Sequence, residues 1–339
     1  KAPLYGMLAA GVVVLGVVTF LVWPKEEKLS KAQIYARELE AQRAAVGPAK
    51  AAGPAVAAAA EAAGTSPAIA ASKDAPFVNT LGMKFVPVPI TGGPSAGQRV
   101  LFGVWAVRVA DYAAYAEANP KVDGEWKSRN KDGVPVGREL DHPVVGVNWE
   151  DAQAFCRWLT EKETAEGKLP KGAVYRLPSD EEWSWAAGLP PEVGATPEEK
   201  HGKNSVDFPW GKEWPPQGKV GNYADETLHG KFPVKKNEKD GRMENEQWVE
   251  GYTDGYATTS PVGSFAANAY GLYDMGGNVW QWCEDLWKPG DTSRVLRGAS
   301  WNDYVRGPLL SSYRSHSTPA SRGSIGGFRV VVAGSSSAR

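Results

Sequence analysis

An apolar run opens the chain, with no charged side chain between Leu4 and Trp23. About 20 apolar residues match the hydrocarbon core of a bilayer at the helical rise of about 1.5 Å per residue. Trp23-Pro24-Lys25 then supplies an interfacial aromatic ring, a helix stop and a charge, and no small-residue cleavage site follows the run. The pattern predicts a transmembrane helix over residues 1–24. The charges on either side are too evenly balanced to fix its orientation.

The next segment is polar and then low in complexity. Residues 25–45 carry charged side chains at helical spacing, and Ser30 is placed to cap a short juxtamembrane helix. Residues 46–75 are almost wholly Ala, Gly, Pro and Ser, a composition that cannot bury enough apolar surface to fold by itself. We expect this linker to hold a globular domain away from a membrane.

A globular pattern begins at about residue 76 and continues to residue 334, before a polar tail over residues 335–339. Apolar alternation and short apolar runs predict strands at residues 83–89, 100–109, 143–147, 294–301 and 327–332. Residues 188–270 hold only scattered apolar pieces and are predicted to be mostly loop.

Capping residues mark three helices of this domain. Asp111 is expected to cap a helix that ends at Ala118. Asn148 precedes an apolar helical face that runs over residues 149–163. Ser179, with Glu182 three residues later, has the spacing of a capping box that opens a third helix.

The stretch over residues 271–285 contains the densest group of unusual residues. Gly276-Gly277 predicts a tight turn that needs a positive φ or a close backbone approach. Large indole rings that need burial and an N–H partner surround it, at Trp280, Trp282 and Trp287. Side-chain oxygens come from Asp274, Asn278, Gln281, Glu284 and Asp285. The mixture suits either a hard cation held in a loop or a dense hydrogen-bonded cluster, and composition alone leaves both open.

Composition excludes several classes of protein. The net charge of −1 provides no overall field for nucleic acid, so we expect no nucleic-acid partner. Cys156 and Cys283 are the two cysteines of the chain, which rules out a disulfide framework and a four-cysteine zinc site but leaves a single bridge undecided. The 14 tryptophans, 38 glycines and 25 prolines predict an aromatic core and much turn-rich structure.

Six motifs then occur in one order, at residues 143–158, 176–183, 208–211, 276–282, 297–301 and 327–329. Together they closely resemble the formylglycine-generating enzyme, or sulfatase-modifying factor, domain. The resemblance covers roughly residues 77–333. It implies a single α+β domain with little regular secondary structure, distantly like C-type lectins, here preceded by one transmembrane helix.

The resemblance also implies where the catalytic groups of the family would lie. The active enzymes carry two cysteines after an Arg-Gly-Gly-Ser strand, and these bind copper and activate oxygen. Asp303 and Pro308 occupy the matching positions here. Proline offers no ligand atom and a carboxylate is a poor ligand for Cu(I), so the resemblance implies a non-catalytic member without copper.

A related domain ends the iron-dependent sulfoxide synthases of thiol-histidine biosynthesis, which need an upstream histidine-rich helical domain. The histidines of this chain lack helical i, i+4 pairing and are His142, His201, His229 and His316. We therefore do not expect that chemistry.

The family's two structural calcium sites map onto residues of this chain. The first would use side chains and carbonyl groups of Asn222, Tyr223, Asp254 and Tyr256. The second would use those of Asp274, Gly277, Val279 and Gln281. Gln281 stands where the family usually has Glu, which removes one anionic ligand, and Asp274 stands where an uncharged Asn is common, which supplies one. Oxygen ligands from loops suit Ca²⁺ in a structural role.

Three functions compete at this stage. The favoured one is a non-catalytic module, anchored by a single span in a bacterial-type inner membrane, whose periplasmic or extracytoplasmic domain docks onto other membrane or envelope proteins. The second is a peptide- or glycan-binding module. Its groove would be lined by Trp301, Asn302, Asp303, Tyr304, Tyr313, Arg314 and His316, because aromatic rings and Arg suit such contacts. The third is an enzyme of altered chemistry that uses Asp303 and His316 as base and acid.

Overall fold

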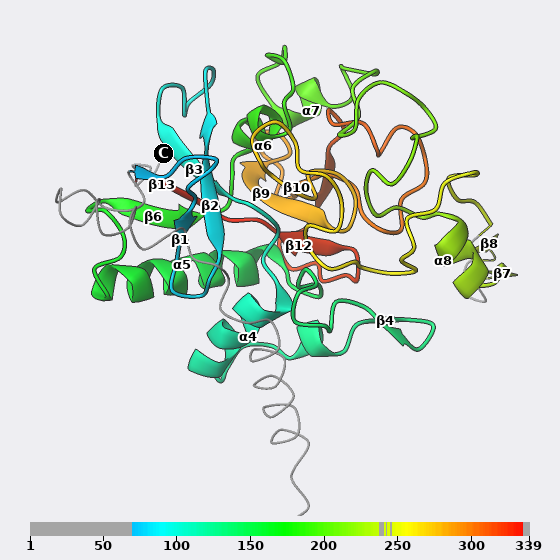
Figure 1. Cartoon of the computed structure of the whole chain (residues 1–339), viewed down its shortest axis with the longest axis horizontal. Coiled ribbons are helices and arrows are strands. Elements are labelled where there is room, and N and C mark those ends of the chain that lie inside the picture. Colours follow the sequence, from blue (N-terminus) through cyan, green and yellow to red (C-terminus); the bar gives the residue numbers. More distant parts are fainter. Residues whose placement is uncertain (1–69, 237–240, 242, 245, 335–339) are drawn as a thin grey trace, which may run out of the picture. The chain divides into compact units, whose positions relative to one another are not determined.

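The computed structural model describes residues 70–236, 241, 243–244 and 246–334 (Figure 1). The predicted transmembrane helix over residues 1–24, the juxtamembrane helix over 25–45, most of the linker over 46–75 and the tail over 335–339 lie outside these residues. Across the described ranges, no helix is both long and apolar enough to cross a membrane.

Two sheets form the framework of the domain (Figure 1). The larger is antiparallel, in the order β1 (Phe77–Val78), β2 (Lys84–Pro89), β3 (Arg99–Gly103), β13 (Val331–Gly334) and β6 (Ala173–Arg176). The second has the order β11 (Ser315–Ser317), β10 (Arg294–Arg297), β9 (Trp280–Leu286) and β12 (Gly326–Phe328), and β12 runs parallel to β9. Two small hairpins are β4 (Asn130–Lys131) with β5 (Val134–Pro135), and β7 (Lys235–Lys236) with β8 (Met243–Glu244).

The longest helices pack beside the larger sheet. α4 (Val109–Ala118) contacts α5 (Trp149–Ala165), and α5 contacts β6 (Figure 1). α6 (Asp180–Ala186) contacts β2 of the larger sheet and β9 and β10 of the smaller one. The short helices are η1 (Glu125–Lys127), α7 (Pro197–Lys200) and α8 (Glu226–Lys231).

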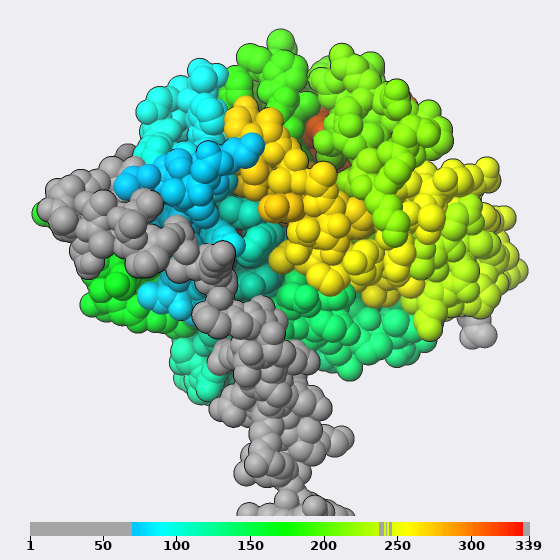
Figure 2. Space-filling model, in the orientation of Figure 1, coloured from blue at the N-terminus to red at the C-terminus, as the bar shows by residue number. Residues whose placement is uncertain are grey.

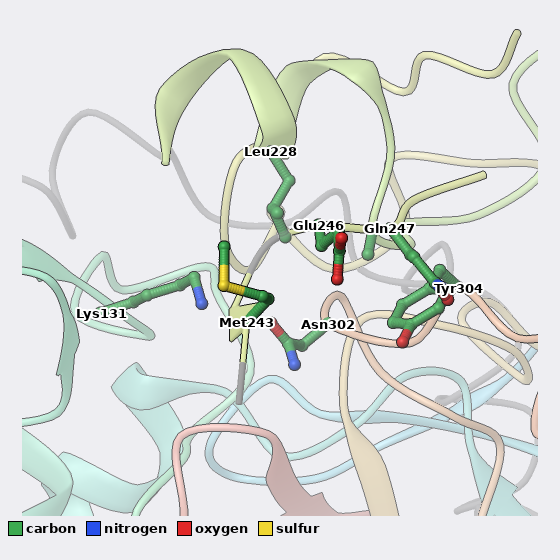
Figure 3. Close-up of a pocket in the computed structure, with 8 residues that line it drawn as sticks. Lys131, Leu228, Met243, Glu246, Gln247, Asn302 and Tyr304 are labelled. Atoms are coloured by element: carbon green, nitrogen blue, oxygen red, sulfur yellow. The ribbon is translucent and has the colours of Figure 1, made fainter. Parts of the chain in front are cut away.

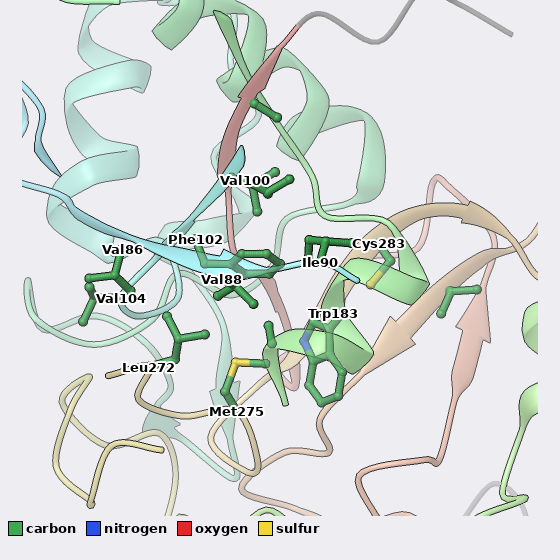
Figure 4. Packing of buried hydrophobic residues seen from close by; sticks show 14 of the residues in the cluster. Val86, Val88, Ile90, Val100, Phe102, Val104, Trp183, Leu272, Met275 and Cys283 are labelled. Atoms are coloured by element: carbon green, nitrogen blue, oxygen red, sulfur yellow. The ribbon is translucent and has the colours of Figure 1, made fainter. Parts of the chain in front are cut away.

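A hydrophobic cluster joins the two sheets (Figure 4). Side chains of β2 and β3, among them Val88 and Phe102, pack with Trp183 of α6 and Cys283 of β9. A second group of rings lies between α4 and α5, where Tyr112 stacks on Phe155 with centroids 6.0 Å apart. Burial of this apolar and aromatic area is the main stabilising contribution to the domain.

Several predicted elements are confirmed. The strand over residues 83–89 is β2, and Asn148 begins α5 with a capping box that Asp151 completes. Ser179 and Glu182 form the expected capping box at the start of α6. Cys156 and Cys283, whose pairing the sequence left undecided, are both buried free thiols.

Other predicted boundaries are wrong. The strand expected over residues 100–109 ends at Gly103, and α4 starts at Val109 with Arg108 as its N-cap, so Asp111 is the third helical residue rather than the cap. Residues 143–147 are buried but form only a bridge between Arg108 and Pro143. Apolar runs report burial, and burial does not require a ladder of hydrogen bonds.

The last two predicted strands are also shorter than expected. β10 ends at Arg297 because Gly298 and Ala299 both have a positive φ, +97° and +62°, which turns the chain out of the sheet. The run over residues 327–332 is divided between β12 and β13, which belong to different sheets. One apolar run therefore links the two halves of the framework.

Candidate functional site

Three loops meet at the turn that Gly276 and Gly277 form. Gly277 has a φ of +79°, and a Cβ there would collide with the backbone carbonyl of Asn222. A Cβ at Gly276 would collide with the ring of Pro209. Both glycines are needed for this approach. On the face in Figure 2, the segment coloured yellow, which contains this turn, lies between the N-terminal strands in blue and cyan and the yellow-green segment.

The four residues of the first predicted calcium site lie together. Asp254 is 1% exposed, and its two carboxylate oxygens accept the backbone N–H groups of Tyr223 at 2.9 Å and Tyr256 at 2.7 Å. Asn222 is buried and donates its amide N–H to Thr258 O at 2.8 Å. Its amide oxygen is buried without a hydrogen-bond partner among the described residues. This buried oxygen is therefore available as a cation ligand, next in sequence to Tyr223, whose N–H the Asp254 carboxylate accepts.

Asp225 is an acidic residue at this site that the sequence did not reveal. It is fully buried, accepts the backbone N–H of Asp254 at 2.6 Å and caps α8 through Leu228 N at 2.9 Å. Burial, together with the charge of Asp225, raises the pKa of Asp254 to about 7. Lys219 donates from the surface to the Asp254 carbonyl at 2.8 Å. The Asp254 carboxylate and the Asn222 oxygen are oxygen donors of the kind that Ca²⁺ takes, whereas Asp225 uses its carboxylate oxygens for backbone N–H groups.

The second predicted calcium site has a different arrangement. Asp274 is mostly buried and accepts Gly263 N–H at 2.8 Å. Gln281 is fully buried, and its side-chain oxygen accepts Trp183 Nε1 at 3.2 Å and Arg329 Nε at 3.0 Å. Its side-chain nitrogen donates to the Asp274 carbonyl at 2.7 Å. In this arrangement Gln281 directs an N–H rather than an oxygen toward Asp274, so its side chain is not a cation ligand.

The two positions of the family's cysteines have no thiol and no free ligand. Asp303 accepts Ser300 N at 2.8 Å and Ser300 Oγ at 2.6 Å, so its carboxylate closes the turn after β10. Burial raises the pKa of Asp303, and hydrogen bonds from Ser300 and Trp280 oppose that shift. Pro308 contributes no donor atom. The pair cannot hold Cu(I) as two thiolates would.

The residues expected to line a groove do not share one surface. Trp301 is 2% exposed and donates its indole N–H to Ser324 O at 3.1 Å. Arg314 is 1% exposed and forms ion pairs with Asp180 at 2.9 Å and Glu192 at 2.5 Å. Both side chains therefore belong to the interior.

Tyr313 and His316 of that set each pack against a ring outside it. Tyr313 contacts His201 with centroids 4.5 Å apart, and His316 stacks on Trp287 at 4.3 Å. The imidazole of His316 therefore stacks on the Trp287 ring, while the Asp303 carboxylate accepts a hydrogen bond from Ser300. The geometry gives no support to an acid–base pair made of these two residues.

Asn302 and Tyr304, the remaining two, do line a pocket (Figure 3). Its volume is about 430 Å³, and Lys131 and Glu246 place charges of both signs at its wall. The other lining residues are Ala224, Leu228, Met243 and Gln247. A pocket therefore lies immediately beside Asp303, the position of the family's first cysteine.

The fold and these motifs define the sulfatase-modifying factor class of domain. Residues 75–334 match the family model described as the sulfatase-modifying factor enzyme 1-like domain. The chain belongs to this family.

Its relatives include proteins named as formylglycine-generating enzymes and proteins named as inactive members of the family. The formylglycine-generating enzyme of Thermomonospora curvata is 30% identical over 228 residues, 61% of this chain and 61% of that protein. The inactive C-alpha-formylglycine-generating enzyme 2 of Bos taurus is 33% identical over 212 residues, 61% of this chain and 55% of that protein. The chain thus spans about three fifths of the length of these relatives.

Two solved structures are similar to this chain at low sequence identity. PvdO from Pseudomonas aeruginosa is 21% identical, with a TM-score of 0.48 over 75% of this chain and 96% of that one. Treponema denticola variable protein 1 is 18% identical, with a TM-score of 0.48 over the same shares.

Proposed function

We propose that this chain is a non-catalytic member of the family that docks onto other proteins. The observation that carries the proposal is the state of the catalytic positions. Asp303 is bound to Ser300 through two hydrogen bonds, and Pro308 has no side-chain donor. The thiolate pair that family members use for copper is absent from the sequence, since Cys156 and Cys283 are buried elsewhere.

The rest of the domain keeps an intact framework, which supports a binding role for it. Arg297 and Arg314 are fully buried and share the carboxylate of Asp180, with Arg297 at 2.5 Å. Networks of this kind hold a single arrangement of loops because every buried charge has a partner. A rigid framework with its catalytic groups replaced suits recognition better than turnover.

The proposed setting is a membrane surface. The apolar run over residues 1–24 and the linker over 46–75 support a single-span anchor and a domain held outside the cytoplasm, next to other membrane or envelope proteins. In this proposal calcium at the first site is structural: it ties together loops that have few sheet hydrogen bonds, because a ligand that binds the folded state stabilises it.

The absence of catalysis is tested with copper and a cysteine peptide. We expect the purified chain to bind no Cu(I) at stoichiometric concentration and to convert no cysteine-containing peptide to an aldehyde. The enzyme of Thermomonospora curvata is the positive control. A double variant, Asp303→Cys with Pro308→Cys, should gain Cu(I) binding if the backbone still presents both positions. Aldehyde formation by the unaltered chain would contradict the proposal.

A second candidate function is binding of a peptide or glycan in the pocket of Figure 3. The observation that favours it is the pocket of about 430 Å³ beside Asp303, with Tyr304 and Asn302 in its wall. Titration with peptide and glycan pools, followed by NMR, tests it. Tyr304→Ala and Lys131→Ala should weaken any binding that occurs there, whereas Lys212→Ala, an exposed lysine outside the pocket lining, should not.

A further inference from the structure

A pocket of about 330 Å³ is lined by residues of α6, α7 and the loop that follows β2 (Figure 1 labels both helices). We infer that it binds a free α-amino acid with an apolar side chain. The lining residues that carry the inference are Glu181 and Trp185 of α6, Leu189, and Lys200 of α7. None of them belongs to the predicted calcium sites or to the pocket of Figure 3. The inference goes beyond the proposed docking function, which neither requires this ligand nor excludes it.

One side of the pocket is held by a buried network of charges. Glu192 accepts both terminal nitrogens of Arg314, at 2.9 Å and 2.5 Å, and it accepts Ser184 Oγ at 2.6 Å. Ser184 Oγ in turn accepts Arg297 Nη1 at 3.0 Å. Because three donors already bind the Glu192 carboxylate, this residue shapes the pocket rather than offering a charge to a ligand.

Lys200 and Glu181 are the charged lining residues that keep hydrogen-bonding capacity. Lys200 is 9% exposed, and its ammonium nitrogen lies 3.5 Å from Glu181 Oε2. That separation is longer than the about 2.7–2.9 Å of a charge-assisted hydrogen bond. Within the described part of the chain, neither side chain has a hydrogen bond to any other residue. The N–H groups of Lys200 and the oxygens of Glu181 therefore suit a ligand that has both an acceptor and a donor group.

The balance of charge at the pocket favours a zwitterion over a simple ion. Lys200 pairs with Glu181, and Arg314 pairs with Glu192, so the positive and negative charges are equal in number. A ligand with one unpaired charge would leave a net charge in this partly buried place, which is unfavourable. An α-amino acid brings a carboxylate for Lys200 and an ammonium group for Glu181, and it leaves the balance unchanged.

The rest of the lining is largely apolar and limits the size of the ligand. Leu189 is buried and Trp185 is half-buried, and Pro190 and Pro191 continue this wall. Gly92 contributes no side chain, and a Cβ there would lie only 3.1 Å from the Trp185 ring. Ligand pockets have volumes of about 300–1,000 Å³, so this one, near the lower limit, suits a single small molecule. The apolar wall favours an aliphatic or aromatic side chain, such as that of leucine or phenylalanine.

Isothermal titration calorimetry of the full chain in detergent, with L-leucine and L-phenylalanine, tests the inference. We expect saturable binding of one amino acid per chain. N-acetyl-L-leucine lacks the ammonium charge and L-leucinamide lacks the carboxylate, so each should bind about ten-fold more weakly than leucine, or worse. Equal affinity for leucine and these two analogues would overturn the inference. So would the absence of saturable binding of both amino acids up to about 10 mM.

Paired variants locate the binding in this pocket. Lys200→Met and Glu181→Gln should each weaken leucine binding about ten-fold or more, whereas Lys203→Met, at an exposed lysine outside the lining, should not change it. Glu181→Gln keeps the shape of the side chain, so it gives a readout even if Lys200→Met does not fold. Tyr304→Ala, in the pocket of Figure 3, should also leave leucine binding unchanged. Full leucine affinity in Glu181→Gln, or its loss in Tyr304→Ala, would show the inference to be wrong.

Discussion

The buried carboxylates of Asp225 and Asp254 are expected to make the stability of the domain depend on pH when no calcium is bound beside them. Both carboxylates are buried, and burial together with the charge of Asp225 raises the pKa of Asp254 to about 7 from its ordinary value of 3.8. The folded state without calcium therefore binds a proton at Asp254 more tightly than the unfolded chain does. Linkage then requires the free energy of unfolding to fall as pH rises from about 4 to about 7, and to stay low above that range.

The size of this effect follows from the pKa difference. About three pKa units, at about 1.36 kcal/mol each, correspond to about 4 kcal/mol lost between pH 4 and pH 7. Such a loss is a large fraction of the stability of an ordinary domain, which is about 5–15 kcal/mol. Calcium at the site would favour the ionised form of both acids, so saturating calcium should remove most of this loss.

Urea unfolding followed by tryptophan fluorescence, at several pH values from 5 to 8, measures the effect with and without calcium. Asp285 also has a raised pKa, about 6, because of burial and the nearby Asp180, and it adds a slope of the same sign. The difference between the calcium and chelator series isolates Asp254, because Asp285 contacts Asp180 rather than the calcium site. Equal pH slopes in the two series would refute the reasoning.

Two further predictions concern packing, and both use urea unfolding of paired variants. Gly277→Ala should cost about 2–4 kcal/mol, because its φ of +79° is strained for alanine and the new Cβ meets the Asn222 carbonyl; Gly290→Ala, with the same φ but open space around it, should cost only about 1 kcal/mol. Equal losses would show that the close approach is unimportant. Arg314→Met should cost about 3–5 kcal/mol because it leaves the buried Glu192 without its arginine partner and removes one of the two arginines on Asp180, whereas Lys288→Met, in an exposed ion pair, should leave stability almost unchanged. A small loss for Arg314→Met would mean that the buried pair contributes little.

Local signals in the sequence predicted local structure well. The caps at Asn148 and Ser179 begin helices because their side chains bond N–H groups three residues ahead, a relation that needs no tertiary information. The strand predicted over residues 327–332 was less successful, because its two halves pair with partners far away in sequence. The position of Val144 and Val145 was correctly predicted to be buried, but burial did not make them a strand.

The candidate site shows the same division between local and tertiary information. The resemblance to the family predicted that Asn222 and Asp254 belong to one site. In the structure Asp254 also contacts Asp225, which the sequence alone marks only as a candidate helix cap. The hydrogen bonds that Arg329 donates depend on residues 103 and 281, which are far from it along the chain. Arg314 has the chemistry of a binding residue, yet it neutralises buried acids, and sequence cannot distinguish the two roles.

The docking role is tested most directly by native separation of gently detergent-solubilised membranes that contain the full chain, with mass spectrometry of the co-migrating proteins. We expect the chain to migrate in a defined assembly, with the same partner or partners in a fixed ratio. Migration alone, near its own 36.4 kDa plus the detergent micelle, would contradict the docking role. The pocket beside Asp303 would then be the place to search for a ligand.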